Sequence, residues 1–250
     1  MESIEKALTK LYRKRAAKKV YAAMNNTVKY GPFAGLKFSG GSHISDTSLA
    51  LKALGLYETE VVDHLLSLTT CDALINLGAG DGYFPVAMAR AGYINKALAF
   101  EMNEEGRRAI AANAALNGVA EQIAIHGAAD ANLTATLAAL GVEPAKTMVL
   151  CDIEGAEYDV LDQALIDGLA AAHFVIELHP FMVADGEARE SAMAARFSAT
   201  HDVSIIKAQP RDWRDLEEVE ALHDLERALV TSEGRKLLAR WMIATPRVRT

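Results

Sequence analysis

The chain has 250 residues, of which 51% are hydrophobic and 24% charged, and this suits one large domain, or a domain with an extension, built around a full core. No apolar run reaches the roughly 18 residues of a membrane-spanning helix, and the acidic start (Glu2, Glu5) is not typical of a secretory signal. The two cysteines, Cys71 and Cys151, are too few for a disulfide framework or a zinc site. We therefore expect a cytoplasmic protein with buried free thiols.

The charge is distributed unevenly. The formal net charge is −7, but residues 1–30 carry eight basic and two acidic side chains, so this segment is +6 and the rest is −13. An acidic body argues against a broad nucleic-acid surface, whereas the basic segment leaves a small one open.

Residues 2–24 are expected to form an amphipathic helix, because apolar residues recur there at three- and four-residue steps. We expect such a helix to pack on the main domain or on a second subunit with its basic face in solvent, so a homo-oligomer through it is one expectation. Contact with anionic lipid or RNA is the alternative. A turn-rich segment follows at 30–36, and residues 47–68 return to helical periodicity. We expect residues 1–70 to form a helical N-terminal extension or lid.

From residue 72 onward, short apolar runs alternate with helical patterns. The predicted strands are 73–77, 97–101, 122–126, 147–151, 173–178, 203–207 and 237–244. The predicted helices are 83–92, 104–117, 132–140, 157–170, 186–200 and 212–233. This alternation predicts an α/β domain over residues 71–250, with a Rossmann-like, seven-stranded, mostly parallel sheet.

A glycine-rich loop joins the first of these strands to its helix. Gly78, Gly80 and Gly82 stand at alternate positions directly before Tyr83, as in a sharp strand-to-helix turn whose backbone approaches a ligand. A dinucleotide fold requires glycine at position 83, and the tyrosine excludes that interpretation. The Gly-x-Gly-x-Gly spacing instead resembles motif I of class I S-adenosylmethionine (SAM) methyltransferases.

Acidic residues follow the second and third predicted strands. Glu101 comes twenty-three residues after Gly78, and its two carboxylate oxygens suit both hydroxyls of a ribose. Asp130 follows the third strand, where it is placed to accept from an adenine amino group, with the small Ala129 leaving room for the ring. Ligands bind at the carboxyl ends of parallel strands, so both acids are expected to face the loop.

The fourth strand is followed by Asp152-Ile153-Glu154-Gly155-Ala156-Glu157. Asp152 and Glu154 are expected beside the reacting methyl group. Helix capping is the alternative role for acids at this position, and we expect it in part for Glu157.

The fifth strand ends in Glu177, Leu178 and His179. Residues 177 and 179 point to the same side of a strand, so His179 is a candidate general base and Glu177 is available to orient it. A structural histidine before Pro180 is the alternative.

With these segments collected, the chain resembles the FkbM-type SAM-dependent methyltransferases. The matching segments are 76–82, 99–101, 113–117, 152–157 and 175–179, and the likeness covers about residues 30–180. The resemblance implies a seven-stranded sheet with a reversed hairpin at its edge, SAM as cofactor, and methylation of a hydroxyl group on a small molecule, sugar or natural product. The chain departs from many class I enzymes at Asn76, where they carry an acid.

The predicted site has two parts. The expected cofactor contacts are Asn76, Gly78, Ala79, Gly80, Asp81, Gly82, Tyr83, Phe84, Glu101, Met102, Ala129, Asp130 and Asp152. The expected catalytic residues are His179, Asp152, Glu154 and Glu177. The same four side chains suit a divalent cation as an alternative, but there is no separate metal motif, and no metal is predicted.

Two other functions stay open. One is an RNA methyltransferase that uses the basic N-terminal helix, and the other is a non-catalytic interaction module with this fold. No Asn-Pro-Pro-Tyr or Asp-Pro-Pro-Tyr segment follows the fourth strand, and there is no Pro-Cys nucleophile. These absences disfavour amino-group and cytosine-carbon methylation and leave oxygen as the expected acceptor atom.

Overall fold

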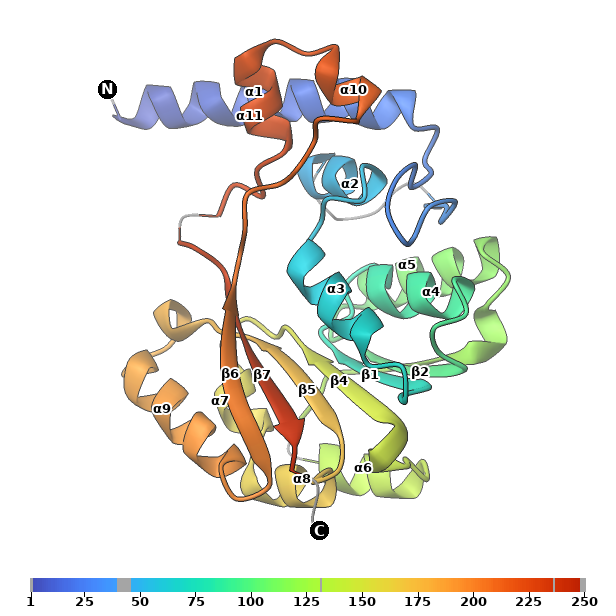
Figure 1. The fold of residues 1–250 in the computed structure, drawn as a ribbon, viewed down its shortest axis with the longest axis vertical. Helices are drawn as coiled ribbons and strands as arrows, with labels where there is room; N and C mark the ends of the chain where they lie inside the picture. The colour runs from blue at the N-terminus through green and yellow to red at the C-terminus, as the bar shows by residue number, and fades with distance from the viewer. Residues whose placement is uncertain (1, 40–45, 131, 236, 248–250) are drawn as a thin grey trace. The chain divides into compact units, whose positions relative to one another are not determined.

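The structure is a computed structural model that describes residues 2–39, 46–130, 132–235 and 237–247 (Figure 1). By its internal contacts the chain divides into two units, Met1–Thr59 with Gln209–Leu238, and Glu60–Ala208 with Ala239–Thr250. This division differs from the expected 1–70 and 71–250, because a late segment of the chain packs with the N-terminal helices. Parts of the expected extension (residues 1 and 40–45) lie outside the described residues, and its role as a lid stays a prediction.

The first unit is helical. It contains α1 (Glu2–Ala23), α2 (Asp46–Ala53), α10 (Glu217–Glu220) and α11 (Asp224–Val230). Its core is formed by apolar residues of these helices and their connections, among them Ala17, Val20, Leu51, Val219 and Val230. The amphipathic helix expected at 2–24 is confirmed as α1, whereas the single helix expected at 212–233 is two short ones.

Among the residues of α1 whose burial is described (7–23), those that join this core lie in the second half of the helix. Ala16 and Val20 are buried, as is Met24 directly after the helix, but Leu8 and Leu11 are largely exposed. A homo-oligomer through α1 stays a prediction. No helix in the described part of the chain has the length and apolar character needed to cross a membrane.

The second unit contains the predicted seven-stranded sheet. The strands are β1 (Ala73–Leu77), β2 (Lys96–Phe100), β3 (Ile123–His126), β4 (Thr147–Cys151), β5 (His173–Glu177), β6 (His201–Lys207) and β7 (Arg240–Pro246). Their order is β3-β2-β1-β4-β5-β7-β6. All neighbours are parallel except β7, which runs antiparallel to both β5 and β6. The prediction of a Rossmann-like, mostly parallel sheet is confirmed.

Helices cover both faces of this sheet (Figure 1). One face carries α3 (Thr59–Ser67), α4 (Tyr83–Arg90) and α5 (Glu104–Leu116), and the other carries α6 (Leu133–Ala139), α8 (Gln163–Gly168) and α9 (Gly186–Phe197). The buried core on the second face joins Leu137, Ile166 and Phe197 to the strands. Apolar side chains on both sides explain why the central strands are continuous apolar runs.

Two predicted helices are interrupted in the structure. The segment 47–68 breaks at Gly55, which has φ of +69° and lies so close to Tyr30 that a β-carbon would sit 2.4 Å from its carbonyl oxygen. The segment 157–170 divides into α7 (Glu157–Val160) and α8, because the side chain of Asp162 accepts a hydrogen bond from the Leu165 amide and starts a new helix.

The strand order reverses between β1 and β4. These neighbours pair in parallel from Ala73 opposite Thr147 to Leu77 opposite Cys151, while the chain between them forms β2 and β3 on the other side of β1. In open α/β sheets the crevice at such a reversal is where ligands bind.

Candidate active site

The glycine loop begins in direct contact with the end of β4. Gly78 has φ of +81°, and a β-carbon on it would lie 1.8 Å from the carbonyl oxygen of Asp152. The Asp152 amide in turn donates to the Leu77 carbonyl at 2.9 Å. Only glycine tolerates both the left-handed backbone and this close approach. The glycine loop and the acidic segment after β4 are therefore in direct contact.

We expect Gly78→Ala to lower the free energy of unfolding by about 2–5 kcal/mol, as the sum of a left-handed alanine and an overpacked contact with the β4 backbone. Gly92→Ala is the matched control, because Gly92 has φ of +79° and open space around it. That variant should lose only the backbone component, about 1–2 kcal/mol. Urea unfolding of both variants measures the difference, and equal losses would show that the contact with Asp152 is unimportant.

Glu101 fastens the loop to the end of β2. Its side chain is buried, with one oxygen accepting from the Gly80 amide at 2.9 Å and the other from the Asn103 amide at 2.8 Å. Each carboxylate oxygen has a second acceptor position, so both still suit the ribose hydroxyls expected there.

Gly106 is a residue of this region that the sequence analysis did not identify. A β-carbon on it would lie 2.6 Å from the Glu101 side chain and 2.9 Å from the Gly80 carbonyl. Helix α5 therefore passes close against the loop only because position 106 has no side chain. A glycine in the first turn of a predicted helix was the signal that could have found it, because it costs helix stability and so indicates a packing role.

Other predicted cofactor residues support the loop from within. Asp81 is buried and accepts from the Tyr83 amide at 3.2 Å, and its carbonyl accepts from the Asn113 side chain at 2.8 Å. Asn76 lies inside β1, where its side-chain Nδ2 donates to the Leu150 carbonyl at 3.4 Å. For Asn76 and Asp81 the structure thus shows contacts to the protein's own backbone, and a contact with cofactor stays a prediction.

The remaining predicted cofactor residues lie at the carboxyl ends of β1, β2 and β3 or begin α4. Ala79, Phe84 and Tyr83 are buried. Met102, next to Glu101, leaves 73% of its surface exposed. Asp130 is exposed, and its carboxylate accepts from the Asn132 amide at 2.8 Å. The expected neighbour Ala129 is partly buried beside it.

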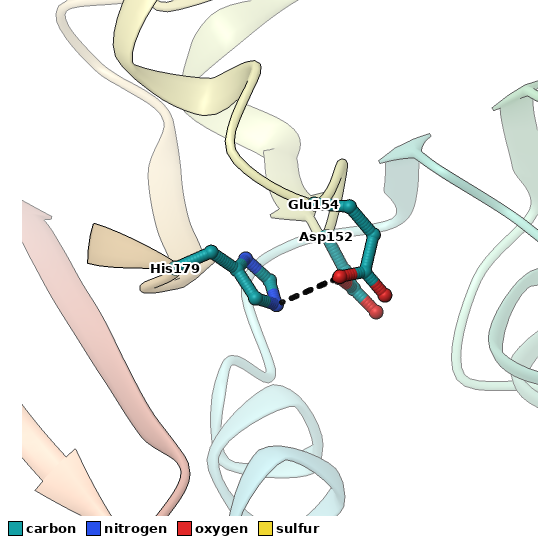
Figure 2. Close-up of side chains that lie close together, drawn as sticks. All are labelled: Asp152, Glu154 and His179. Carbon is teal, nitrogen blue, oxygen red and sulfur yellow. Dashed lines mark ion pairs between the residues drawn. The ribbon is translucent and has the colours of Figure 1, made fainter. Parts of the chain in front are cut away.

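The four predicted catalytic side chains come together at the ends of β4 and β5. The Nε2 atom of His179 lies 3.6 Å from Asp152, 3.7 Å from Glu154 and 3.7 Å from Glu177. Figure 2 shows Asp152, Glu154 and His179 converging from their two segments. We call these three residues and Glu177 the acid–histidine cluster.

A fifth acid, Glu157, holds the imidazole in this position. Its side chain has no exposed surface, and one oxygen accepts from the His179 amide at 3.0 Å and lies 3.3 Å from Nδ1 of the same residue. The other oxygen accepts from the Gly155 amide at 2.7 Å. Glu157 therefore orients the ring, the role that was expected of Glu177, and Glu177 lies on the Nε2 side instead.

The surroundings shift the titration of both partners. Burial lowers the pKa of His179, but the hydrogen bond to Glu157 and the charge of Asp152 outweigh it, so the pKa is raised above its usual value. Burial raises the pKa of Glu157, but the hydrogen bond to His179 reverses the effect and the pKa is lowered. The cluster thus favours positive charge at the imidazole.

The backbone after β4 is strained where it delivers Glu154. This residue has φ of +53°, in the left-handed region that side chains other than glycine rarely adopt. Gly155 follows with φ of +104° and lies against Met182 and Val183. Strained residues of this kind gather at functional sites, and here the turn carries one carboxylate to His179 and aims an amide at Glu157.

Comparison with known proteins yields similarity in structure alone. No model of a known protein family matches the chain, and no curated protein matches it. Among solved structures, a candidate O-methyltransferase from Klebsiella pneumoniae has a TM-score of 0.52 at 11% identity, covering 98% of this chain and 97% of that one.

Two further structures are similar over three quarters of the chain. The O-methyltransferase TomG from Streptomyces achromogenes, involved in tomaymycin synthesis and solved with SAM, has a TM-score of 0.51 at 16% identity and covers 75% of this chain and 78% of that one. Cofactor-bound Rv0187 from MTB has a TM-score of 0.51 at 15% identity, covering 75% and 80%. The likeness shows that the chain has the fold of these proteins.

Proposed function

We propose that this protein is a SAM-dependent methyltransferase that methylates a hydroxyl oxygen of a small molecule, sugar or natural product. One observation carries the proposal: the Gly78 loop and the acid–histidine cluster share one edge, because Gly78 lies against the backbone of Asp152. A cofactor held by the loop and Glu101 would therefore end beside the carboxylates and the imidazole.

The cofactor part of the proposal rests on the region around Gly80. The loop offers open space at Gly80, where no atom of the described residues would lie within 4 Å of an added β-carbon, and Glu101 stands next to it with further acceptor positions. TomG, which has this fold, was solved with SAM. We place the ribose of SAM at Glu101 and its adenine toward Met102 and Asp130.

The chemistry would be an in-line displacement. The hydroxyl oxygen forms a bond to the methyl carbon, the carbon–sulfur bond breaks, and S-adenosylhomocysteine leaves. The hydroxyl proton passes to the acid–histidine cluster, where Nε2 of His179 accepts it as long as that nitrogen is not bound to a metal ion. Proximity and orientation supply much of the rate in such a transfer, and proton removal makes a weak nucleophile competent.

The finer assignment to the FkbM type is supported by the segment that resembles that family most specifically, residues 152–157. All three of its acidic side chains and one of its backbone amides make contacts here: Asp152 and Glu154 face Nε2, the Gly155 amide binds Glu157, and Glu157 orients His179. A helix-capping role alone does not account for these contacts.

Calorimetric titration with SAM and with S-adenosylhomocysteine tests the proposal. We expect one site per chain with a dissociation constant in the micromolar range. No heat at millimolar ligand would overturn the proposal and favour a non-catalytic module. A screen with methyl-labelled SAM against sugars, glycolipids and polyketides would then identify the acceptor.

A further inference from the structure

The acid–histidine cluster has the geometry of a cation site. Three carboxylate oxygens, from Asp152, Glu154 and Glu177, lie 3.6–3.7 Å from the same nitrogen of His179. The ligand atoms of Asp152, Glu154 and His179 all lie within 4.8 Å of one another. Side chains from two strand ends thus direct nitrogen and oxygen atoms at one small space (Figure 2).

These separations do not correspond to hydrogen bonds. A hydrogen bond from nitrogen to oxygen spans about 2.7–3.2 Å, so none of the three carboxylates bonds directly to Nε2. Around a metal ion with bonds of about 2.0–2.2 Å, neighbouring ligand atoms lie roughly 3.0–3.6 Å apart and opposite ones about 4.0–4.4 Å. The three distances from Nε2, 3.6–3.7 Å, reach the range for neighbouring ligand atoms with a contraction of a few tenths of an ångström.

A second observation, independent of the carboxylates at Nε2, comes from the other side of the ring. The His179 side chain is 5% exposed, and its Nδ1 lies 3.3 Å from the fully buried Glu157. A carboxylate on one ring nitrogen places the proton there and directs the lone pair of the other nitrogen outward, which is how metal-binding histidines are held. Among the described residues, Nε2 makes no hydrogen bond, and this buried nitrogen faces the carboxylates of the cluster.

We propose that Asp152, Glu154 and His179, with Glu177 as a fourth group, bind a divalent cation of the first transition row. An imidazole nitrogen among carboxylates suits manganese, iron or zinc, whereas magnesium and calcium prefer oxygen ligands alone. Asp152 and Glu154 are 34% and 70% exposed, which leaves one side of the site open to a further ligand.

The role of the cation in the reaction rests on the proposed function, whereas its binding does not. The open side would accept the hydroxyl oxygen of the methyl acceptor, and the cation would lower the pKa of that hydroxyl. The proton would then pass to water, and His179 would be a ligand in place of a proton acceptor.

Manganese is the probe for the test. The full-length protein, freed of metal with a chelator, is titrated with MnCl₂ and followed by electron paramagnetic resonance and calorimetry. We expect one ion per chain and a nitrogen coupling from the imidazole in the pulsed spectrum. Asp152→Asn and His179→Ala should each weaken binding about 10- to 100-fold, a range seen even for outer-shell changes. The exposed Glu121→Gln is the control and should bind like the wild type.

Absence of binding at millimolar manganese, absence of the nitrogen coupling, or equal affinity in the Asp152 and His179 variants would each overturn the cation site. The wild-type spectrum decides the question even if a variant fails to fold. SAM is titrated into the same samples. If the protein binds manganese but not SAM, the result counts against the proposed function alone. If it binds SAM but not manganese, the result counts against the cation site alone.

Discussion

Replacement of His179 by alanine is expected to lower the turnover of methyl transfer by about 10²- to 10⁴-fold, the usual range for a group that assists proton removal, while SAM binding is unchanged. The physical reason is the separation of the two tasks in the chain. SAM is expected at the Gly78 loop and Glu101, whereas Nε2 of His179 lies among the carboxylates after β4 and β5. Turnover with labelled SAM and the accepted substrate, together with calorimetry, measures both.

His173→Gln is the matched control, because His173 is the first residue of β5, and His179 follows the last residue of the same strand. It lies at the opposite end of β5 from the acid–histidine cluster, so turnover should stay near the wild-type value. Equal turnover in the His179 variant would remove this residue from the chemistry. Loss of both turnover and SAM affinity would instead show that His179 supports the expected SAM site at the Gly78 loop and Glu101.

Replacement of Glu101 by alanine is expected to weaken SAM binding by about 10²-fold or more, because charge-assisted hydrogen bonds of about 1.5–3 kcal/mol each are lost. Two of them would come from the ribose, and the amides of Gly80 and Asn103 also lose their acceptor. The loop is therefore released at the same time. Calorimetric titration gives the affinity directly.

Glu105→Ala serves as the control for this change. Glu105 lies four residues further along, in the first turn of α5, and is exposed. Its removal should leave SAM affinity as it was. Glu101→Gln is the milder change. Its carbonyl oxygen still accepts from one of the two backbone amides, whereas its NH₂ group accepts from neither. An unchanged affinity in Glu101→Ala would show that the ribose lies elsewhere.

The arrangement of the candidate site was predictable because of a general property of parallel sheets. Strands of one direction bring their carboxyl ends to the same edge, so residues that follow successive apolar runs meet there. Glu101, Asp152 and His179 were placed correctly by this rule without any knowledge of strand order. The strand-to-helix turn before Tyr83 was likewise predictable, because its sharp backbone locally requires closely spaced glycines.

The partner of His179 was not predictable in the same way. Glu177 shares a strand face with it, and period two made it the natural choice. The structure uses Glu157, twenty-two positions away, because the turn at Glu154 and Gly155 bends the chain so that this acid enters the buried space behind the ring. A left-handed turn at a residue other than glycine has little local signature, and its direction is set by the packing around it.

The composition of the first unit also depended on tertiary packing. Helical periodicity showed that segments 2–24 and 212–233 each have an apolar side, but it carries no information on which apolar side meets which. Burial of Val20 and Leu51 with Val219 joins segments about two hundred positions apart. Such an association is stabilised by surface removed from water, which depends on shape more than on local sequence.

The sequence by itself determined the alternation of strands and helices, the glycine loop at Gly78, and the acids and imidazole at the strand ends. These features depend on periodicity and on residues with special backbone or hydrogen-bonding properties, which act within a few positions. Only the tertiary structure decided that Gly78 lies against Asp152, that Glu157 orients His179, and that three carboxylates surround Nε2. Those contacts join separate strands and turns, and their distances are set by the packing of the whole sheet.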